Sequence, residues 1–195
     1  MLRISGGQYK RTILEGPPDE QTTRPITARA KESLFNLLRG WCDGAKVLDL
    51  FAGVGAIGLE ALSRGASEVV LVEFDRRIAR ILERNIRAVE GEDRAQLVIA
   101  DALGPAALAQ APRDCDLIFI DPPYALWSDV DGRERIIDLM SRASEQMKEK
   151  SFLVLRTPCD WEEGVAVKGL NGPETHPYAI DMFVHLFMPS GVEKG

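Results

Sequence analysis

The sequence of 195 residues is short of cysteine, histidine and long apolar runs, and each shortage removes a class of protein. Its three cysteines stand far apart and none shares a two-residue spacing with another, so we expect neither a disulfide framework nor a zinc site. His176 and His185 likewise have no ligand partners at metal-binding spacing. We therefore expect no bound metal and a reducing, cytoplasmic compartment.

The sequence also contains no stretch with the pattern of a membrane-spanning segment. No apolar stretch approaches the roughly 20 residues that cross a bilayer, and the first seven residues lack the apolar core of a signal peptide. With 45% hydrophobic residues, the length suits one domain with a sizeable core and a small extension. We expect a protein that acts away from membranes.

An excess of basic charge is missing as well, because the net charge is −6. This value argues against a protein that coats nucleic acid. Residues 1–40 differ from the rest, since they hold seven basic and four acidic side chains and so leave −9 for the remaining chain. For so small an excess alone, a solvated charged face is the favoured explanation, but only this end is suited to a phosphate backbone.

Residues 1–20 predict a small β-hairpin that extends from the main domain. Two short apolar stretches flank a diglycine turn at Gly6-Gly7, a pattern typical of paired strands. Lys10 and Arg11 follow this turn and are the candidates for contact with a nucleic acid backbone. We expect residues 21–195 to form the main domain.

The main domain alternates between apolar strands and amphipathic helices, which predicts an α/β fold with a parallel sheet covered on both faces. We expect strands at residues 46–50, 68–73, 96–100, 115–120 and 152–156. We expect helices at residues 28–39, 56–64, 75–89, 103–109 and 132–148.

The carboxyl-terminal part follows a different pattern. Asn171-Gly172-Pro173 predicts a turn, and residues 179–188 alternate as a strand, with Ile180 on the apolar side and His185 on the polar side. The short loops leave little room for another crossover helix. The last strands should therefore form an antiparallel hairpin at one edge of the sheet.

The first candidate site is the tetrapeptide Asp121-Pro122-Pro123-Tyr124, which follows the buried strand predicted at residues 115–120. In open α/β sheets, ligands bind at the carboxyl ends of the strands. Two consecutive prolines make this turn stiff and leave its carbonyl groups unpaired. Such a turn, with an acid and a tyrosine, can hold a planar molecule that bears an NH2 group.

The second candidate site is the glycine-rich turn that follows the strand predicted at residues 46–50. Gly53 and Gly55 allow the backbone to approach a ligand closely, and Gly58 allows the next helix to pack closely on the sheet. Glu73 ends the next strand and is placed to accept hydrogen bonds from a ribose. Asp101 follows the third strand and can accept from an adenine amino group.

The acid at Asp49, just before the glycines, distinguishes between two classes of cofactor. A dinucleotide places its pyrophosphate on the helix that follows the turn and usually requires a second nucleotide-binding half. S-adenosyl-L-methionine has no pyrophosphate and carries a cationic end that suits a nearby acid. The pattern therefore favours the methyl donor over NAD.

Six motifs cover nearly the whole domain and are specific in combination. They are Arg24-Pro25, residues 29–36, Asp49-Leu50-Phe51-Ala52-Gly53-x-Gly55, residues 58–66, Val72-Glu73-x-Asp75 and Asp121-Pro122-Pro123-Tyr124. Together they resemble the RsmD-type 16S rRNA (guanine-N2)-methyltransferases. The last motif alone is shared with DNA adenine and protein glutamine methyltransferases, whereas the motifs at residues 24–36 and 58–66 are not typical of those enzymes.

The resemblance implies a class I, Rossmann-like methyltransferase fold, with a mainly parallel seven-stranded sheet, and methyl transfer from S-adenosyl-L-methionine to a guanine N2 of 16S rRNA. It implies a small ribosomal subunit or an assembly intermediate as the partner. The chain departs from the family at Ile26, where threonine is common, at Val54, where serine is common, and in its final strand. The implied cofactor-binding residues are Asp49, Phe51, Ala52, Gly53, Gly55, Glu73, Phe74, Asp101 and Ala102.

The expected mechanism depends on alignment of the acceptor amine. Asp121 and the Pro122 carbonyl would accept its N–H groups, Pro123 would stiffen the turn, and Tyr124 would stack on the extruded base. Arg24 and Arg29 would contact RNA phosphate or form surface ion pairs. Three alternatives remain: a methyltransferase for DNA adenine or protein glutamine, a nucleotide-binding oxidoreductase, and a non-catalytic assembly factor.

Overall fold

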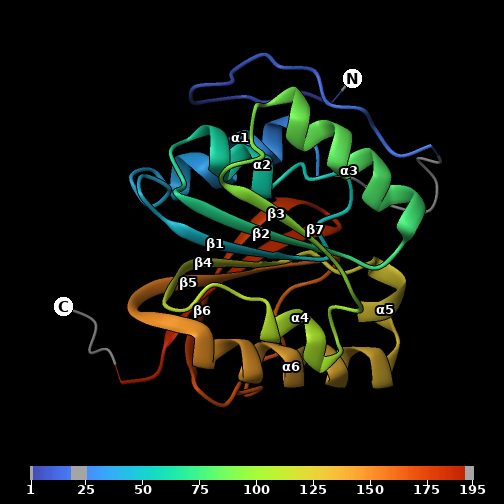
Figure 1. Ribbon diagram of the computed structural model, residues 1–195. Coiled ribbons are helices and arrows are strands. Elements are labelled where there is room, and N and C mark those ends of the chain that lie inside the picture. The colour runs from blue at the N-terminus through green and yellow to red at the C-terminus, as the bar shows by residue number, and fades with distance from the viewer. Residues whose placement is uncertain (1, 19–25, 192–195) are drawn as a thin grey trace.

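The computed structural model describes residues 2–18 and 26–191, and its centre is one seven-stranded sheet with helices on both faces (Figure 1). The strand order is β3-β2-β1-β4-β5-β7-β6. The strands are β1 Lys46–Leu50, β2 Glu68–Glu73, β3 Ala95–Ile99, β4 Cys115–Ile120, β5 Met147–Thr157, β6 Leu170–Ala179 and β7 Met182–Pro189.

The helices divide between the two faces of the sheet (Figure 1). One face carries α1 Ala28–Leu37, α2 Gly58–Ser63 and α3 Arg76–Ala88. The other face carries α4 Pro105–Ala109, α5 Tyr124–Ser128 and α6 Val130–Ala143, and the 3-10 turn Ser144–Gln146 follows α6. Within the described residues, no helix combines the length and the apolar composition that crossing a membrane requires.

The strands β1 to β5 are parallel, whereas β7 is antiparallel to both β5 and β6. The predicted α/β fold with an antiparallel edge is therefore confirmed. The chain reverses its direction of strand addition between β1 and β4, and ligands bind at such a switch point, outside the carboxyl ends of the strands. The first two candidate motifs follow these two neighbouring strands.

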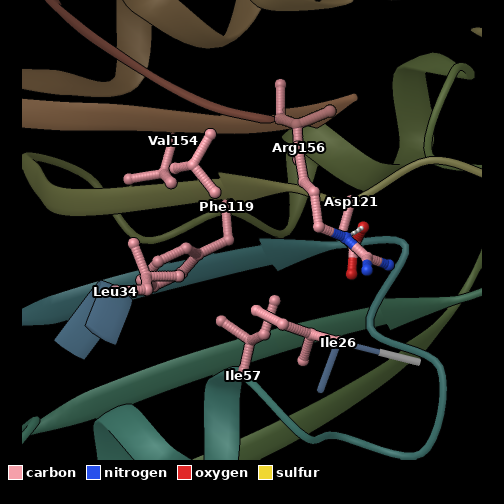
Figure 2. A pocket seen from close by; sticks show the side chains of 9 residues that line it. Ile26, Leu34, Ile57, Phe119, Asp121, Val154 and Arg156 are labelled. Carbon is pink, nitrogen blue, oxygen red and sulfur yellow. Dashed lines mark hydrogen bonds and ion pairs between the residues drawn. The ribbon is translucent and has the colours of Figure 1, made fainter. Parts of the chain in front are cut away.

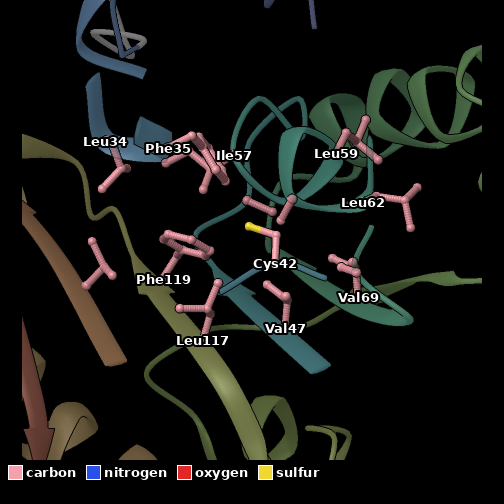
Figure 3. Packing of buried hydrophobic residues seen from close by; sticks show 14 of the residues in the cluster. Leu34, Phe35, Cys42, Val47, Ile57, Leu59, Leu62, Val69, Leu117 and Phe119 are labelled. Atoms are coloured by element: carbon pink, nitrogen blue, oxygen red, sulfur yellow. The ribbon is translucent and has the colours of Figure 1, made fainter. Parts of the chain in front are cut away.

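The central strands are apolar on both faces because helices cover both of them. Val47, Leu117 and Phe119 face the α1–α3 side, where they pack against Leu34 and Phe35 of α1 (Figure 3). The alternate residues of β1 and β4 pack toward α6. This double coverage fixes the positions of the strand ends on which the candidate site is built.

The amino-terminal hairpin is held on the α2 surface. It contains a single antiparallel bridge, Arg3 to Ile13, in place of two regular strands, and Ile4 and Leu14 are buried. Its tip reaches the last turn of α2, where the Gln8 backbone N–H donates to the Ser63 carbonyl at 2.7 Å. The hairpin therefore covers α2 along its length.

A buried ionic cluster joins the hairpin to α1 and α2. Lys31 Nζ lies 2.9 Å from Glu60 Oε2 and donates to the Arg3 carbonyl at 2.8 Å. Glu60 also accepts from the Ser5 backbone N–H and hydroxyl, both at 2.8 Å, and from Arg64 Nε at 2.8 Å. Lys31 and Glu60 are 1% and 0% exposed, so removal of either would leave the other charge without its main counter-ion away from water.

Two predicted boundaries were wrong near the last strands. The Asn171-Gly172-Pro173 segment lies inside β6 and forms a bulge; an edge strand tolerates proline there because its outer side needs no ladder bond. The helix expected at residues 132–148 ends at Ala143, because pairing of Met147 with Cys115 of β4 overrides the local helix propensity.

The prediction that His185 lies on the polar side of its strand was also wrong, since this residue is completely buried. Thr157 Oγ1 donates to the Cys159 carbonyl at 2.6 Å and so accepts from His185 Nε2 at 2.7 Å. Thr175 Oγ1 then donates to Nδ1 at 2.9 Å, which assigns the Nε2–H tautomer. Burial lowers the pKa of His185 and keeps the ring neutral.

We predict that Lys31→Met lowers the free energy of unfolding by about 3–5 kcal/mol, because it leaves Glu60 buried without its main counter-ion. Urea denaturation monitored by circular dichroism measures this change. Glu83→Gln, which breaks the exposed Arg87–Glu83 pair, is the matched control and should cost at most about 0.5 kcal/mol. A loss below about 1 kcal/mol for Lys31→Met would contradict a stabilising role of the cluster.

Candidate active site

The glycine turn, residues 51–57, connects β1 to α2 at the carboxyl edge of the sheet. Phe51, Gly53 and Gly55 have positive φ angles of 65°, 55° and 89°. A positive φ is strained for Phe51, and such strain of about 1–3 kcal/mol is typical of ligand-binding segments. The local backbone therefore favours a binding function over a simple connection.

The glycines of this turn have different surroundings. A Cβ built on Gly53 meets nothing within 4 Å, so a ligand can approach the backbone there. A Cβ on Gly55 would lie 2.6 Å from Leu82 of α3, and one on Gly58 would lie 2.7 Å from Leu71 of β2. Gly53 thus faces open space, whereas Gly55 and Gly58 allow close packing of the helices.

Asp49 is a buried carboxylate directly below the glycine turn. Its Oδ2 accepts from the Gly58 backbone N–H at 2.8 Å, and its Oδ1 has no hydrogen-bond partner among the described residues. Burial raises the pKa of Asp49 to about 8, and the negative charges of Asp121 and Glu73 add to this effect. The site therefore favours a ligand that brings a cation or an N–H donor to Asp49.

Glu73 braces the glycine turn from the end of β2. Its Oε2 accepts from the Gly53 backbone N–H at 2.9 Å and its Oε1 accepts from that of Asp75 at 2.7 Å. Burial raises the pKa of Glu73. An ionised carboxylate has about four acceptor positions, so Glu73 can still accept from ribose hydroxyls.

An apolar surface lies beside Glu73 at the same edge. Phe74 is 73% exposed, and Ile99, the β3 partner of Glu73, is 52% exposed. Ala102 is buried, while Asp101 is exposed and accepts from the Leu103 backbone N–H at 3.0 Å. This surface suits a purine ring, with Asp101 in position for its amino group.

These residues fit the methyl donor S-adenosyl-L-methionine. The unpartnered buried oxygen of Asp49 suits its cationic end, Glu73 suits its ribose, and the exposed Phe74 suits its adenine. The glycine turn carries no charged side chain, and the charged groups beside it are the carboxylates of Asp49 and Glu73. That charge pattern would disfavour a pyrophosphate.

The Asp121–Tyr124 corner follows β4, the strand beside β1, and the Asp121 backbone N–H donates to the Leu50 carbonyl at 3.4 Å. Pro122 is buried, Pro123 is exposed and precedes the first residue of α5, and Tyr124 is half-buried. The glycine turn and this corner therefore lie on neighbouring strand ends at one edge, as the order of the motifs suggested.

Arg156, at the end of β5, was not among the predicted site residues. Its Nε lies 2.5 Å from Asp121 Oδ1 (Figure 2). Its guanidinium carbon lies 5.4 Å from the centre of the Tyr124 ring. Burial raises the pKa of Asp121, and the Arg156 charge opposes that shift. The sequence did contain one signal for this residue, because a basic side chain at the end of the buried strand predicted at residues 152–156 is unusual.

A small apolar cavity separates this ion pair from the α1 side of the sheet (Figure 2). Its volume is about 10 Å³, which holds roughly one water molecule. Ile26, one of the departures from the family, lines this cavity together with Ile57 and Phe119. Ile26 thus adds an apolar wall next to Asp121 where a hydroxyl is common.

The predicted RNA-contact residues do not gather around the corner. Lys10 and Arg11 are exposed at the hairpin tip, beside the end of α2, so they lie toward the amino ends of the strands. Arg29 is exposed in the first turn of α1, three residues after Ile26. Arg24 lies outside the described residues.

A larger cavity of about 210 Å³ lies between α5, α6 and the loop after β5. Trp127 and Trp161 line it, and Trp127 Nε1 donates to Cys159 Sγ at 3.3 Å. Trp127 is itself buried and packs against Trp161, with ring centres 6.0 Å apart. Trp127 therefore supports the loops on the α6 side of the site.

The strand order, the glycine turn and the buried acids together define a class I S-adenosylmethionine-dependent methyltransferase fold. A family model described as Conserved hypothetical protein 95 matches residues 2–181, and the chain belongs to this family.

Three relatives agree with this assignment. The chain is 40% identical over 123 residues to the Ribosomal RNA small subunit methyltransferase D of Escherichia coli (strain K12), an alignment that covers 63% of this chain and 60% of that one. It is 41% identical over 125 residues to the Putative rRNA methyltransferase YlbH of Bacillus subtilis (strain 168), covering 63% and 67%. The solved structure of the putative methyltransferase yhhF from Escherichia coli matches with a TM-score of 0.75, 29% identity and coverage of 96% and 97%. The expected RsmD-type resemblance is confirmed.

We predict that S-adenosyl-L-methionine binds more tightly as the pH rises from 6 to 7.5. The raised pKa of about 8 means that Asp49 is mostly protonated in the free protein, and a cationic ligand requires its ionised form, so binding must release a proton. Calorimetry in two buffers of different ionisation enthalpy measures this release.

Asp49→Asn should abolish the proton release and weaken binding by about 10- to 100-fold, the range for one charge-assisted hydrogen bond. Asp101→Asn, an exposed acid at the same edge, is the matched control and should leave the proton release unchanged. Binding of the donor to the unaltered protein without any proton release would show that Asp49 does not face its cationic end.

Proposed function

We propose that this protein transfers a methyl group from S-adenosyl-L-methionine to the exocyclic N2 amine of a guanine in 16S rRNA. The observation that carries this proposal is the placement of the Asp121–Tyr124 corner beside Asp49 and the glycine turn, on neighbouring strand ends. The proposed setting is the cytoplasm, with a small ribosomal subunit or its assembly intermediate as the substrate.

Alignment is the main contribution that the corner would make. The guanine N2 lone pair is delocalised into the ring, so the amine is a poor nucleophile. S-adenosyl-L-methionine supplies a methyl carbon that is activated by a positively charged sulfur. Asp121 and the Pro122 carbonyl would hold the N2 protons, and alignment of this kind lowers a barrier by about 7–11 kcal/mol, more than the 10²–10⁴-fold typical of general base catalysis.

Tyr124 would stack on the extruded base. Base–aromatic stacking contributes about 1–3 kcal/mol, which offsets part of the cost of removing a base from its stack. The stiff Pro122-Pro123 step would fix the ring relative to Asp121. Both contacts would act on the base before transfer.

The charge of the glycine turn supports a methyl donor over a dinucleotide, because Asp49 and Glu73 are acids at the position where a pyrophosphate would bind. The corner alone does not distinguish guanine from DNA adenine or a protein glutamine. The choice of rRNA rests on the names of the relatives. The acceptor therefore requires a direct test.

We predict that tritiated S-adenosyl-L-methionine labels small ribosomal subunits or 16S rRNA, and that Asp121→Ala lowers labelling at least about 10³-fold through loss of alignment. Labelling should be measured in parallel on DNA and on a release-factor-like protein. Asp138→Ala, which removes an exposed acid of α6, is the matched control. Donor binding by calorimetry verifies that the Asp121→Ala site remains intact, and label that appears only on protein or DNA would reverse the assignment.

We propose that Lys10 and Arg11 contact RNA phosphate away from the target base, since the hairpin tip lies beside the end of α2. We predict that the double change Lys10→Ala and Arg11→Ala weakens RNA binding and lowers the slope of log affinity against log salt by up to about 2. The rate at saturating RNA should not change. Lys168→Ala, on the α6 side, is the control, and an unchanged slope for the double variant would remove the hairpin tip from the RNA interface.

A further inference from the structure

We infer that Arg156 is a positioning residue for methyl transfer: from the end of β5 it holds the Asp121 carboxylate in the orientation that accepts the N–H of the target amine. This inference rests on the proposed function, because it assigns Asp121 the acceptor contact. It adds a residue that the glycine turn and the Asp121–Tyr124 corner do not contain.

The geometry of the pair supports a fixed orientation. Ile120 of β4 pairs with Leu155 of β5, so Asp121 and Arg156 are the next residues in register on adjacent strands. The Nε–Oδ1 distance is 2.5 Å, and the two side chains are only 8% and 15% exposed. Strand pairing therefore places the guanidinium beside the carboxylate without a flexible loop between them.

The same guanidinium also contacts the proposed stacking ring. Arg156 lies over the Tyr124 ring at 5.4 Å, so one side chain connects the acid of the corner with its aromatic residue. A guanidinium is planar and can bond a carboxylate while it stacks on an aromatic face, whereas a lysine ammonium is a point charge. Arginine at this position can thus fix two contacts to a base at once.

The surroundings of Asp121 make its counter-ion important. Among residues 2–18 and 26–191, the charged groups that act on it are Asp49 from β1 and Arg156 from β5, and Arg156 in turn contacts Tyr124 of α5. The other side chains around the small cavity are apolar, and they come from α1, the glycine turn, β4, β5 and β7. Arg156 is therefore the group that favours the ionised form of Asp121 in an otherwise unfavourable environment.

An ionised Asp121 is what the proposed reaction requires. The N2 lone pair forms the new N–C bond while the methyl–sulfur bond breaks, and the electron pair of that bond stays on sulfur. N2 then loses one proton, which passes to the Asp121 carboxylate. A protonated Asp121 would accept the N–H more weakly during alignment and could not take up that proton.

The test compares Arg156→Met with Arg156→Lys in the full chain, with kcat/KM for tritium transfer to small subunits measured from pH 5.5 to 9. We expect Arg156→Met to move the acidic limb of this profile upward by about 1–3 pH units, since a buried carboxylate loses its neighbouring cation. At pH 7 its rate should fall at least about tenfold and recover in part at higher pH. Arg156→Lys should keep the limb near its original position, with a lower rate.

Two measurements separate this inference from other effects. Calorimetric binding of S-adenosyl-L-methionine should stay within about threefold of the unaltered protein, because Arg156 contacts Asp121 and Tyr124 of the corner. If Arg156→Met fails to fold, Arg156→Gln replaces it, with the same shift expected. An acidic limb that does not move in a folded variant would overturn the inference, as would a faster reaction with a lower KM for RNA, which would make Arg156 a plug of the acceptor site.

Asp121→Ala, which removes both carboxylate oxygens, distinguishes failure of the inference from failure of the proposed function. If Asp121→Ala retains the rate of the unaltered protein, Asp121 is not the acceptor contact and the proposed mechanism fails with the inference. If Asp121→Ala is inactive and Arg156→Met shows no shift, only the role of Arg156 is lost.

Discussion

Two carboxylates are largely withdrawn from water at the ends of the neighbouring strands β1 and β4: Asp49 is buried and the side chain of Asp121 is 15% exposed. The cost of this withdrawal constrains the rest of the site. An isolated buried charge is so unfavourable that the group either becomes neutral or finds a partner. The two acids differ in how their burial is compensated. Asp49 has a pKa raised to about 8 and is mostly neutral near pH 7, whereas Asp121 is paired with Arg156.

This difference matches the two halves of the proposed reaction. A neutral Asp49 can lose its proton when a cation arrives, so its charge appears together with its ligand. Asp121 has its counter-ion in place on the neighbouring strand before the acceptor base enters. The glycine turn connects the two halves, because Glu73 braces Gly53 at the ligand side while Gly55 and Gly58 hold the turn against α3 and β2.

The fold and the location of the site could be predicted from the sequence because both depend on local patterns. Apolar strands, glycines and acids at strand ends mark the carboxyl edge without knowledge of the packing. The partner of Asp121 could not be found in this way, since strand order decides that β5 lies beside β4. The burial of His185 could not be predicted for the same reason. Its partners Thr157 and Thr175 come from two other strands, whereas alternation along β7 alone indicates a polar side.

Two ion pairs of low exposure lie within the part of the chain that the structure describes, Lys31–Glu60 and Arg156–Asp121, and the difference between them indicates which one is structural. Burial raises the pKa of Glu60, but its donors, namely Lys31, Ser5 and Arg64, outweigh this effect and the pKa is lowered. Asp121 has fewer such donors, and its pKa remains raised in spite of Arg156. A carboxylate that served stability alone would gain from further donors, or from replacement of the pair by apolar residues, which is often neutral or stabilising. An acid that must accept hydrogen bonds from a substrate needs acceptor positions that the protein does not already fill, and Asp121, with few donors around it, meets this requirement.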